Sequence, residues 1–564
     1  MQNKESHHKN GMLGWLKHYQ RAALVGDINA GAVVALLLIP QGIAYALVAG
    51  LPPVTGLYAS VLPPLAYALL GSSMVQSVGA QAITALMIGT TLATLAPHGS
   101  TLSLILASQM ALIAGATLLL CGLLRLGFLA SFLSRPVMSG FTTGSAIVIA
   151  GEQVKPLLGG SLNSMHVPGM TIGLGALLAL WLAKQYLTGL LVRLGLVQSW
   201  AETLSKLAPA FILLLATVLV SVLDLHRAGV SVVGEVPSGF PSLSFAASSS
   251  HWGVLVKPSM LLAFVIFLFS QSSAQALAQR RNERINADHE LLGLGAANLM
   301  SALSGSFPVT GSISRSAVNF TAGANTPLAS IISACFLGLV LLAPTTWLAL
   351  LPIPVLAATI ILAVLGMVDL SAFKEAWRYD RGDAAAMLTA AGGVLVLGVE
   401  EGVILGVALS LATLIWRASR PHMAVLGRIP GTEHFRNVRR HEVETLPGVL
   451  MLRIDADLFF GNADVIVGHI EHLLDGREHQ TVPIRHILLV MSAVNLIDTT
   501  ALHALKELNQ NLKKRGITLH LSEIKGPVMD HLQRSDFIER LNDGQIFLST
   551  AQAYDFLAKN ERIF

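Results

Sequence analysis

One arginine among small hydroxyl residues stands out inside an otherwise apolar part of the chain, at positions 311–320 (GSISRSAVNF). Pro308 precedes this segment and breaks any helix that arrives from upstream. A short helix beginning here would direct free backbone N–H groups and the positive end of its dipole at a small volume. Ser312, Ser314 and Arg315 would add donors to the same volume. This combination suits a small anion, and the alternative is a polar surface loop whose arginine reaches outward to water.

Two further groups of polar residues lie in apolar surroundings. Gln41 and Tyr45 are four residues apart, so they share one face of a helix and could both reach a ligand. The alternative for this pair is hydrogen bonding between packed helices, which membrane bundles commonly use. Gln81 lies in a second broken segment, 77–82, where small residues begin another helix. Arg315 also has an alternative role, in which it pairs with a carbonyl or carboxylate and still raises the local positive potential.

The composition divides the chain into a membrane part and a soluble part. Of the 564 residues, 53% are hydrophobic and only 12% are charged, whereas a soluble protein has about 25% charged residues. Between Gly26 and Gly122 the only charged side chain is Asp27, but charges are dense after Arg417. The net charge of +4 therefore reflects loops and tails and requires no nucleic-acid partner. Cys121 and the other cysteine do not form a disulfide or metal pattern, and no sequence motif indicates a cofactor or an enzyme.

Fourteen apolar segments are expected to cross or enter the lipid bilayer. They are 28–49, 51–70, 76–96, 101–123, 130–150, 171–192, 207–225, 258–279, 289–304, 312–322, 327–348, 353–369, 384–399 and 401–417. If the N-terminus is cytoplasmic, most basic loop residues fall on the cytoplasmic side, and the outer loops hold only Lys155, Arg227 and Lys257. An even number of segments then places the C-terminal region in the cytoplasm as well.

An internal repeat relates the two halves of the apolar region. Gly79 superposes on Gly311 with an offset of 232, and the segment 41–47 superposes on 271–277 with an offset of 230. Corresponding interrupted segments in two halves of seven indicate an inverted repeat, with the substrate site near mid-membrane where the broken helices meet.

Beyond the apolar region the pattern is that of a small α/β domain. Short apolar strands are expected at 449–454, 487–491 and 517–521, with helices at about 462–476 and 499–515 between them. The predicted organisation is a tail at 1–25, a membrane part at 26–420, a linker at 421–439 and the α/β domain at 440–564.

At these residues the chain resembles the SulP anion transporters, the family of sulfate permeases, with a C-terminal STAS domain. The resemblance covers nearly the whole chain. The motifs that carry it lie at 27–31 (DINAG), 39–46 (IPQGIAYA), 56–58 (GLY), 290–298 (ELLGLGAAN), 311–319 (GSISRSAVN) and 495–501 (NLIDTTA).

The resemblance implies a seven-plus-seven inverted repeat divided into core and gate domains, in which the anion lies between the N-termini of the third and tenth helices. It implies an elevator-like alternating access mechanism and a homodimer. By motif, the anion-lining residues would be Gln41, Tyr45, Gln81, Ser312, Ile313, Ser314 and Arg315.

Two positions depart from the family's pattern. Gly79 is followed by Ala80, where many relatives have a proline, so a softer break is expected before the third helix. Many proton-coupled relatives carry a glutamate in the eighth segment, but this chain has no acidic residue between Glu235 and Glu283 and has Phe269 and Ser270 at the aligned position. The absence of a titratable carboxylate at the midplane weakens the case for proton symport, and the coupling ion (proton, sodium, bicarbonate or none) stays open.

In the soluble domain, Asp498 follows a buried strand and is expected to cap a helix. Thr499 or Thr500 could accept a phosphate, because soluble relatives of this domain are phosphorylated on a serine at this position. The STAS domain would regulate the carrier, mediate dimerisation or bind a cytoplasmic partner.

The sequence therefore predicts a carrier for a small inorganic anion, sulfate above others, in a plasma membrane of the bacterial inner-membrane type. Three alternatives stay open. The same fold could carry bicarbonate, chloride or a dicarboxylate, could conduct chloride as a channel, or could sense an anion and signal through the STAS domain.

Overall fold

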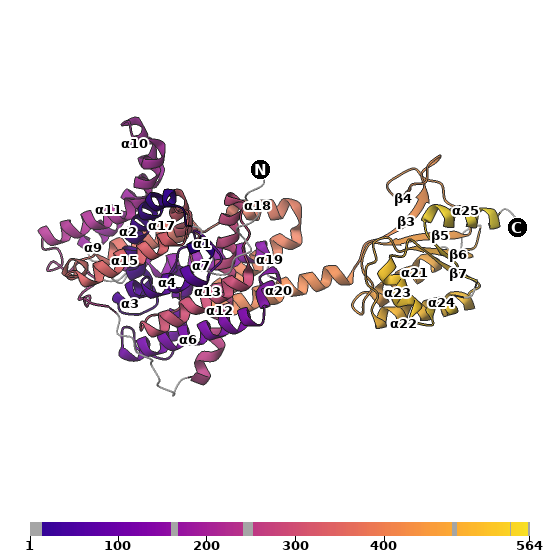
Figure 1. The fold of residues 1–564 in the computed structure, drawn as a ribbon, viewed down its shortest axis with the longest axis horizontal. Coiled ribbons are helices and arrows are strands. Elements are labelled where there is room, and N and C mark those ends of the chain that lie inside the picture. The colour runs from indigo at the N-terminus through magenta and orange to yellow at the C-terminus, as the bar shows by residue number, and fades with distance from the viewer. Residues whose placement is uncertain are drawn as a thin grey trace. The chain divides into compact units, whose positions relative to one another are not determined.

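The computed structural model describes residues 14–17, 19–132, 134–159, 167–240, 252–476, 482–541 and 543–561. Of the predicted tail, only 14–17 and the residues from 19 onward belong to this described part. The chain divides into two compact units, Met1–Ser410 and Leu411–Phe564 (Figure 1).

At least one helix overlaps each of the fourteen predicted apolar segments of the chain, so the prediction of a polytopic helical membrane domain is confirmed. The second segment is split into α3 (Val54–Tyr58) and α4 (Leu62–Leu70), and the sixth continues from α9 (Val167–Leu182) through a π-helical turn into α10 (Thr188–Arg193). The others are α2 (Leu24–Val48), α5 (Ala82–Ala93), α6 (Thr101–Leu123), α7 (Arg135–Glu152), α11 (Gln198–Val222), α12 (Trp252–Arg281), α13 (Ala287–Leu303), α14 (Ile313–Thr321), α15 (Leu328–Leu342), α17 (Ile353–Leu365), α19 (Arg381–Leu397) and α20 (Val399–Ser419).

Seven spans in the described part of the chain are individually long and apolar enough to cross a membrane. They are Arg21–Val48, Thr101–Leu123, Val167–Arg193, Trp200–Val222, Trp252–Arg281, Ile353–Tyr379 and Val399–Ser419. Helices α5 and α14 are too short to cross a bilayer of about 30 Å, since an α-helix rises about 1.5 Å per residue.

The helix packing follows the predicted two-half arrangement. Each segment of the first half corresponds to the segment seven places later in the second half. The packed pair α2 and α15 (segments 1 and 11) therefore corresponds to α12 and α6 (segments 8 and 4), which also pack together. In the same way, the packed pair α7 and α19 corresponds to the packed pair α17 and α9. Two halves related by a two-fold axis in the membrane plane produce this reciprocity.

A buried carboxylate fastens the start of α13 to the turn that follows α4. Glu290 is fully buried and accepts hydrogen bonds from the Tyr67 hydroxyl at 2.7 Å and from the backbone N–H groups of Ser72 and Ser73 at 2.9 and 3.1 Å. These donors compensate for the burial of the charge, so Glu290 stabilises the packing of the two halves.

The second unit is built on one six-stranded sheet in the order β4-β3-β5-β6-β7-β8. Strands β5 (Val449–Ile454), β6 (His486–Val490), β7 (Thr518–Ser522) and β8 (Ile546–Phe547) run parallel, which confirms the α/β prediction. Helices α21 (Ala463–Asp475), α22 (Thr499–Lys514) and α23 (Gly526–Gln533) pack on one face, and α25 (Thr550–Glu561) packs on the other (Figure 1).

Residues 421–439 differ from the linker that the sequence predicts. They form β3 (Met423–Arg428) and β4 (Phe435–Asn437), and β3 joins the sheet antiparallel to β5. The physical reason is the alternating burial of β3: Ala424 and Leu426 are buried with residues of α25 in the core on that face of the sheet.

Candidate functional site

The two interrupted segments meet through a short piece of sheet inside the membrane unit. Strand β1 (Val78–Gly79) pairs antiparallel with β2 (Thr310–Gly311), and the Ser312 N–H donates to the Ser77 carbonyl at 3.1 Å. Helix α5 follows β1 directly and α14 follows β2 directly. The antiparallel pairing therefore brings the N-termini of both short helices to the same place, as the internal repeat predicts.

Both helix N-termini retain free backbone donors. The residues before the helices, Gln81 and Ser312, have extended backbones and make no capping bond through their side chains. The N–H groups of Ala85 and Ser316 bond back to the carbonyls of Gln81 and Ser312 at 2.9 Å, which leaves the first-turn N–H groups without a helical partner. Two such ends produce a positive potential that favours an anion.

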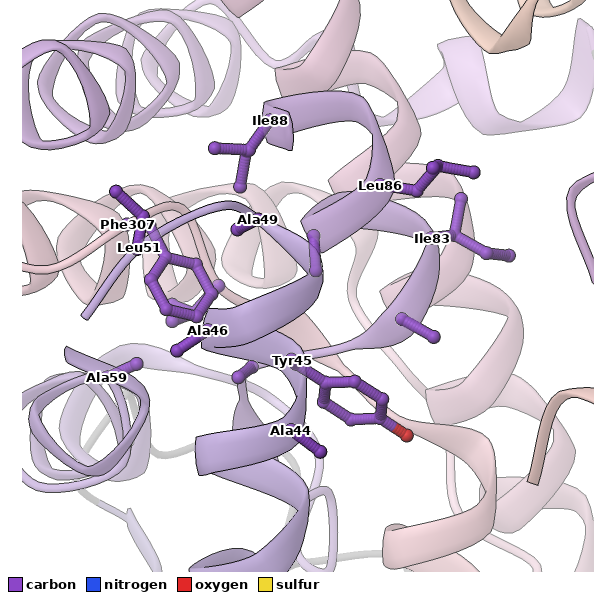
Figure 2. Close-up of a cluster of buried hydrophobic side chains, with 14 of the residues drawn as sticks. Ala44, Tyr45, Ala46, Ala49, Leu51, Ala59, Ile83, Leu86, Ile88 and Phe307 are labelled. Carbon is purple, nitrogen blue, oxygen red and sulfur yellow. The ribbon is translucent and has the colours of Figure 1, made fainter. Parts of the chain in front are cut away.

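A cleft of about 1260 Å³ lies against these helix ends. Six of the seven predicted anion-lining residues line it, namely Gln41, Tyr45, Gln81, Ser312, Ile313 and Ser314. The Tyr45 side chain is only 7% exposed, and its hydroxyl points away from the cluster around Phe307 and Leu51 (Figure 2). The Ser312 and Ser314 hydroxyls are 3.2 Å apart, close enough to offer donors to one ligand.

Arg315, the seventh predicted residue, lies behind the cleft and does not line it. Its side chain is 1% exposed, and Nη1 donates a hydrogen bond of 2.6 Å to the Ala80 carbonyl between β1 and α5. Within the described residues, Nε and Nη2 have no hydrogen-bond partner. A Cβ atom on Gly79 would lie 3.4 Å from Nη2, so the guanidinium packs against the β1 backbone. Arg315 thus pairs with a backbone carbonyl, which is the alternative role considered from the sequence, and its charge lies close to both helix ends.

Helix α12 contributes a row of glutamines to the cleft that the prediction of site residues did not include. Gln271, Gln275 and Gln279 line the cleft and recur every four residues, so they lie on one face of the helix. Gln271 is 4% exposed, and its Oε1 atom has no partner among the described residues. The four-residue spacing is visible in the sequence and could have identified this polar row within an apolar segment.

Charged residues line the cleft only toward one end, the end that the loop charges predict to be cytoplasmic. They are Arg135 at the start of α7, Lys184 in the π-turn after α9, Glu202 and Lys206 in α11, and Asp369 just before α18 (Leu370–Tyr379). At the aligned proton-site position, Phe269 lines the cleft and the Ser270 hydroxyl accepts a hydrogen bond from the Gln76 amide. The described residues contain no group of three or more His, Cys, Asp or Glu side chains able to hold a metal ion.

Family models match both parts of the chain. The sulfate permease family model matches residues 24–390, and the STAS domain model matches residues 440–553. This chain belongs to the sulfate permease family. Among curated sulfate permease relatives, sulfate transporter 4.1, chloroplastic, of Arabidopsis thaliana is 36% identical, with 96% of this chain and 81% of the relative covered. A probable sulfate transporter of Mycobacterium tuberculosis is 34% identical, with 95% of this chain and 96% of the relative covered.

A solved structure shares the fold. The murine Solute Carrier 26 family member A9 anion transporter in the inward-facing state superposes with a TM-score of 0.86 at 21% identity, covering 97% of this chain and 93% of that chain. The permease is therefore a multi-pass membrane protein with a C-terminal STAS domain.

In the STAS domain, Asp498 lies at the start of α22, as predicted from the sequence. Its Oδ1 atom accepts a hydrogen bond from the Ala501 N–H at 2.8 Å, and its Oδ2 atom accepts from the Phe460 N–H at 2.8 Å. Thr499 and Thr500 are exposed beside it. Asp498 thus both caps the helix and holds a neighbouring loop.

Proposed function

We propose that this permease is a secondary active transporter of a small inorganic anion, with sulfate as the leading candidate. The observation that carries the proposal is the convergence of two helix N-termini and the serine hydroxyls on one cleft inside the membrane unit, with the buried Arg315 guanidinium behind it. The names of the curated relatives support sulfate as the substrate.

The anion would lie between the N-termini of α5 and α14, in contact with Gln41, Tyr45, Gln81, Ser312, Ile313 and Ser314. Backbone N–H groups and hydroxyls would donate to its oxygen atoms, as helix N-termini do for phosphate and sulfate groups. Arg315 would act through its charge while it fastens α14 to the backbone before α5. A desolvated anion gains more from these fixed donors than it would gain from the same donors in water.

Transport would follow an elevator-like alternating access mechanism. The core helices (α2–α6 and α12–α15) carry the site, and five of the gate helices (α7–α11 and α17–α20), namely α7, α9, α10, α11 and α17, line the other wall of the cleft. Movement of the core along the gate would expose the site first to one side of the membrane and then to the other. Both termini would be cytoplasmic in a plasma membrane, and the protein would form a homodimer.

Proton-independent transport is part of the proposal. Among the described cleft residues the carboxylates are Glu202 and Asp369, both toward the cytoplasmic end, and the aligned proton-site position holds Phe269 and Ser270. A midplane carboxylate is what would let a proton travel with the anion. The STAS domain would regulate the carrier, with Thr499 or Thr500 as phosphate acceptors.

The test is labelled sulfate uptake into proteoliposomes that contain the purified permease, with pH, sodium and bicarbonate gradients imposed in parallel arms. We expect sulfate uptake that is the same with and without the proton gradient, and competition by unlabelled sulfate. Uptake that requires the proton gradient would contradict the absence of proton coupling. Bound sulfate without uptake in any arm would favour the anion sensor, and uptake of bicarbonate or chloride instead would change the substrate.

A further inference from the structure

Two threonines occupy equivalent places in the two halves of the membrane unit. Thr91 lies in the last turn of α5, and Thr321 is the last residue of α14. Their separation is 230 residues, the offset that superposes Gln41 on Gln271. Both hydroxyls lie within hydrogen-bond distance of the carbonyl four residues earlier in their own helix, at 2.8 and 2.9 Å.

Each threonine also bonds to a charged side chain of a different helix. The Thr91 hydroxyl donates to Glu400 Oε1 at 2.6 Å, and Lys206 Nζ donates to the Thr321 hydroxyl at 2.6 Å. Glu400 lies in the first turn of α20 and Lys206 lies in α11, which are the last segments of the two halves. Each contact therefore joins the third segment of one half to the seventh segment of the other half. The charged residue is acidic in the first contact and basic in the second.

These contacts join the two helices whose N-termini form the anion site to two helices of the gate. Helices α5 and α14 form the site with their N-termini, and the threonines lie at their opposite ends. Lys206 lines the cleft at its charged end. The loop charges place this end on the cytoplasmic side, and they place Thr91 and Glu400 on the outer side.

One cleft is lined both by the site residues and by the charged residues at its cytoplasmic end, so the arrangement in this structure is taken as cytoplasm-open. We propose that the Thr91–Glu400 and Lys206–Thr321 contacts hold the site helices against the gate in this arrangement, and that both break when the site opens outward. The inference rests on the proposed transport function, because alternating access requires α5 and α14 to move relative to α11 and α20. A hydrogen bond of 2.6 Å is lost when its partners separate by about 1 Å. Removal of one charge-assisted bond should therefore shift the ratio of the two arrangements by about tenfold.

The experiment reads that ratio directly from a reporter cysteine. Thr359 lies midway along α17 and lines the cleft, so Thr359→Cys is introduced into full-length permease in which Cys121 and Cys335 are replaced by alanine. A membrane-impermeant maleimide is applied to inside-out and right-side-out vesicles. The quantity compared is the labelling rate from the cytoplasmic side divided by the rate from the outer side.

We expect Thr91→Val and Glu400→Ala each to lower this ratio about tenfold, and the double variant to match the single variants because they remove the same bond. Thr321→Val should lower the ratio as well. Two adjacent residues supply matched controls. Thr90 bonds the Met87 carbonyl of its own helix at 2.9 Å, so Thr90→Val should leave the ratio unchanged, and so should Glu401→Ala.

An unchanged ratio in Thr91→Val and Glu400→Ala, additive effects in their double variant, or a shift toward the cytoplasm-open state would overturn the proposal. A reporter that is labelled from one side only in every variant would overturn it as well. The labelling requires no anion flux, so a permease that shows the expected shifts but carries no sulfate would refute the proposed transport and not the two contacts.

Discussion

Arg315 permits the sharpest test of how the site binds its ligand, because its position separates a charge effect from direct contact. The guanidinium lies behind the cleft and bonds the Ala80 carbonyl, so Arg315→Gln removes one positive charge without removing a wall of the cleft. At an effective dielectric constant of about 20, a unit charge about 8 Å away contributes roughly 2 kcal/mol per charge on the anion. We therefore expect a loss of about thirtyfold in affinity for a monovalent anion and a far larger loss for sulfate, well above tenfold.

The assay is titration calorimetry on detergent-solubilised permease at constant ionic strength, with sulfate and chloride as ligands. Arg193→Gln, at the exposed end of α10, is the matched control because Arg193 does not line the cleft. Thermal unfolding must first show that the Arg315→Gln protein is folded, since the variant also leaves the Ala80 carbonyl without its donor. Equal losses of affinity for both anions would show that Arg315 has only a structural role, through its bond to the Ala80 carbonyl. Unchanged affinity for sulfate would refute its participation in the site.

Three other predictions concern stability. Replacing Glu290 with glutamine should cost roughly 3 kcal/mol, measured by thermal unfolding in detergent, because an amide cannot accept all the bonds that the buried carboxylate accepts; an unchanged midpoint would contradict this. Asp498→Ala should destabilise the STAS domain by about 1–3 kcal/mol in hydrogen exchange of α22, whereas exposed Thr500→Ala should not. Burial and the neighbouring imidazole lower the pKa of His520 from 6.5 to about 4, so the stability of the STAS domain should be full above pH 6.5 and fall by roughly 3 kcal/mol as pH falls toward 4. Because the Gln545 N–H donates to His520 Nδ1, faster exchange of β8 at low pH, corrected for the intrinsic rate, is the readout, and pH-independent protection would contradict it.

Much of the membrane fold could be predicted because its signals are local. Length, hydropathy and loop charge are properties of each segment, and in the structure at least one helix overlaps each of the fourteen. The break before α14 follows from Pro308, and the break before α5 follows from the superposition of Gly79 on Gly311. In the structure these glycines belong to the two paired strands.

The orientation of individual side chains was less predictable. The residues around Arg315 indicate a polar centre, but the rotamer that directs its guanidinium to the Ala80 carbonyl depends on a segment 235 positions away. Gln271, Gln275 and Gln279 belong to the cleft because α12 turns that face inward. The glutamine spacing predicts the face, but only the packing of the other helices decides that the face borders a cleft.

The linker prediction at 421–439 was wrong for a related reason. Strand β3 has six residues, as β5 has, and it begins with an apolar run at 423–426, so the sequence carried a strand signal here. A run of this length does not by itself distinguish a strand of the sheet from an apolar stretch of a linker. Its burial depends on α25, which follows more than 120 residues later and completes that face of the sheet.

The pairing of β1 with β2 also has a consequence for biogenesis. The backbone groups of Val78 and Gly79 find their partners only at Gly311 and Thr310, which the ribosome adds more than 200 residues later. Inside a bilayer, each unsatisfied backbone group costs several kcal/mol. The first half of the permease therefore enters the membrane with the backbone groups of β1 unpaired. These groups must stay hydrated or be shielded by an insertion factor until the second half arrives. Synthesis that stops between the halves should yield a protein that quality control recognises and removes.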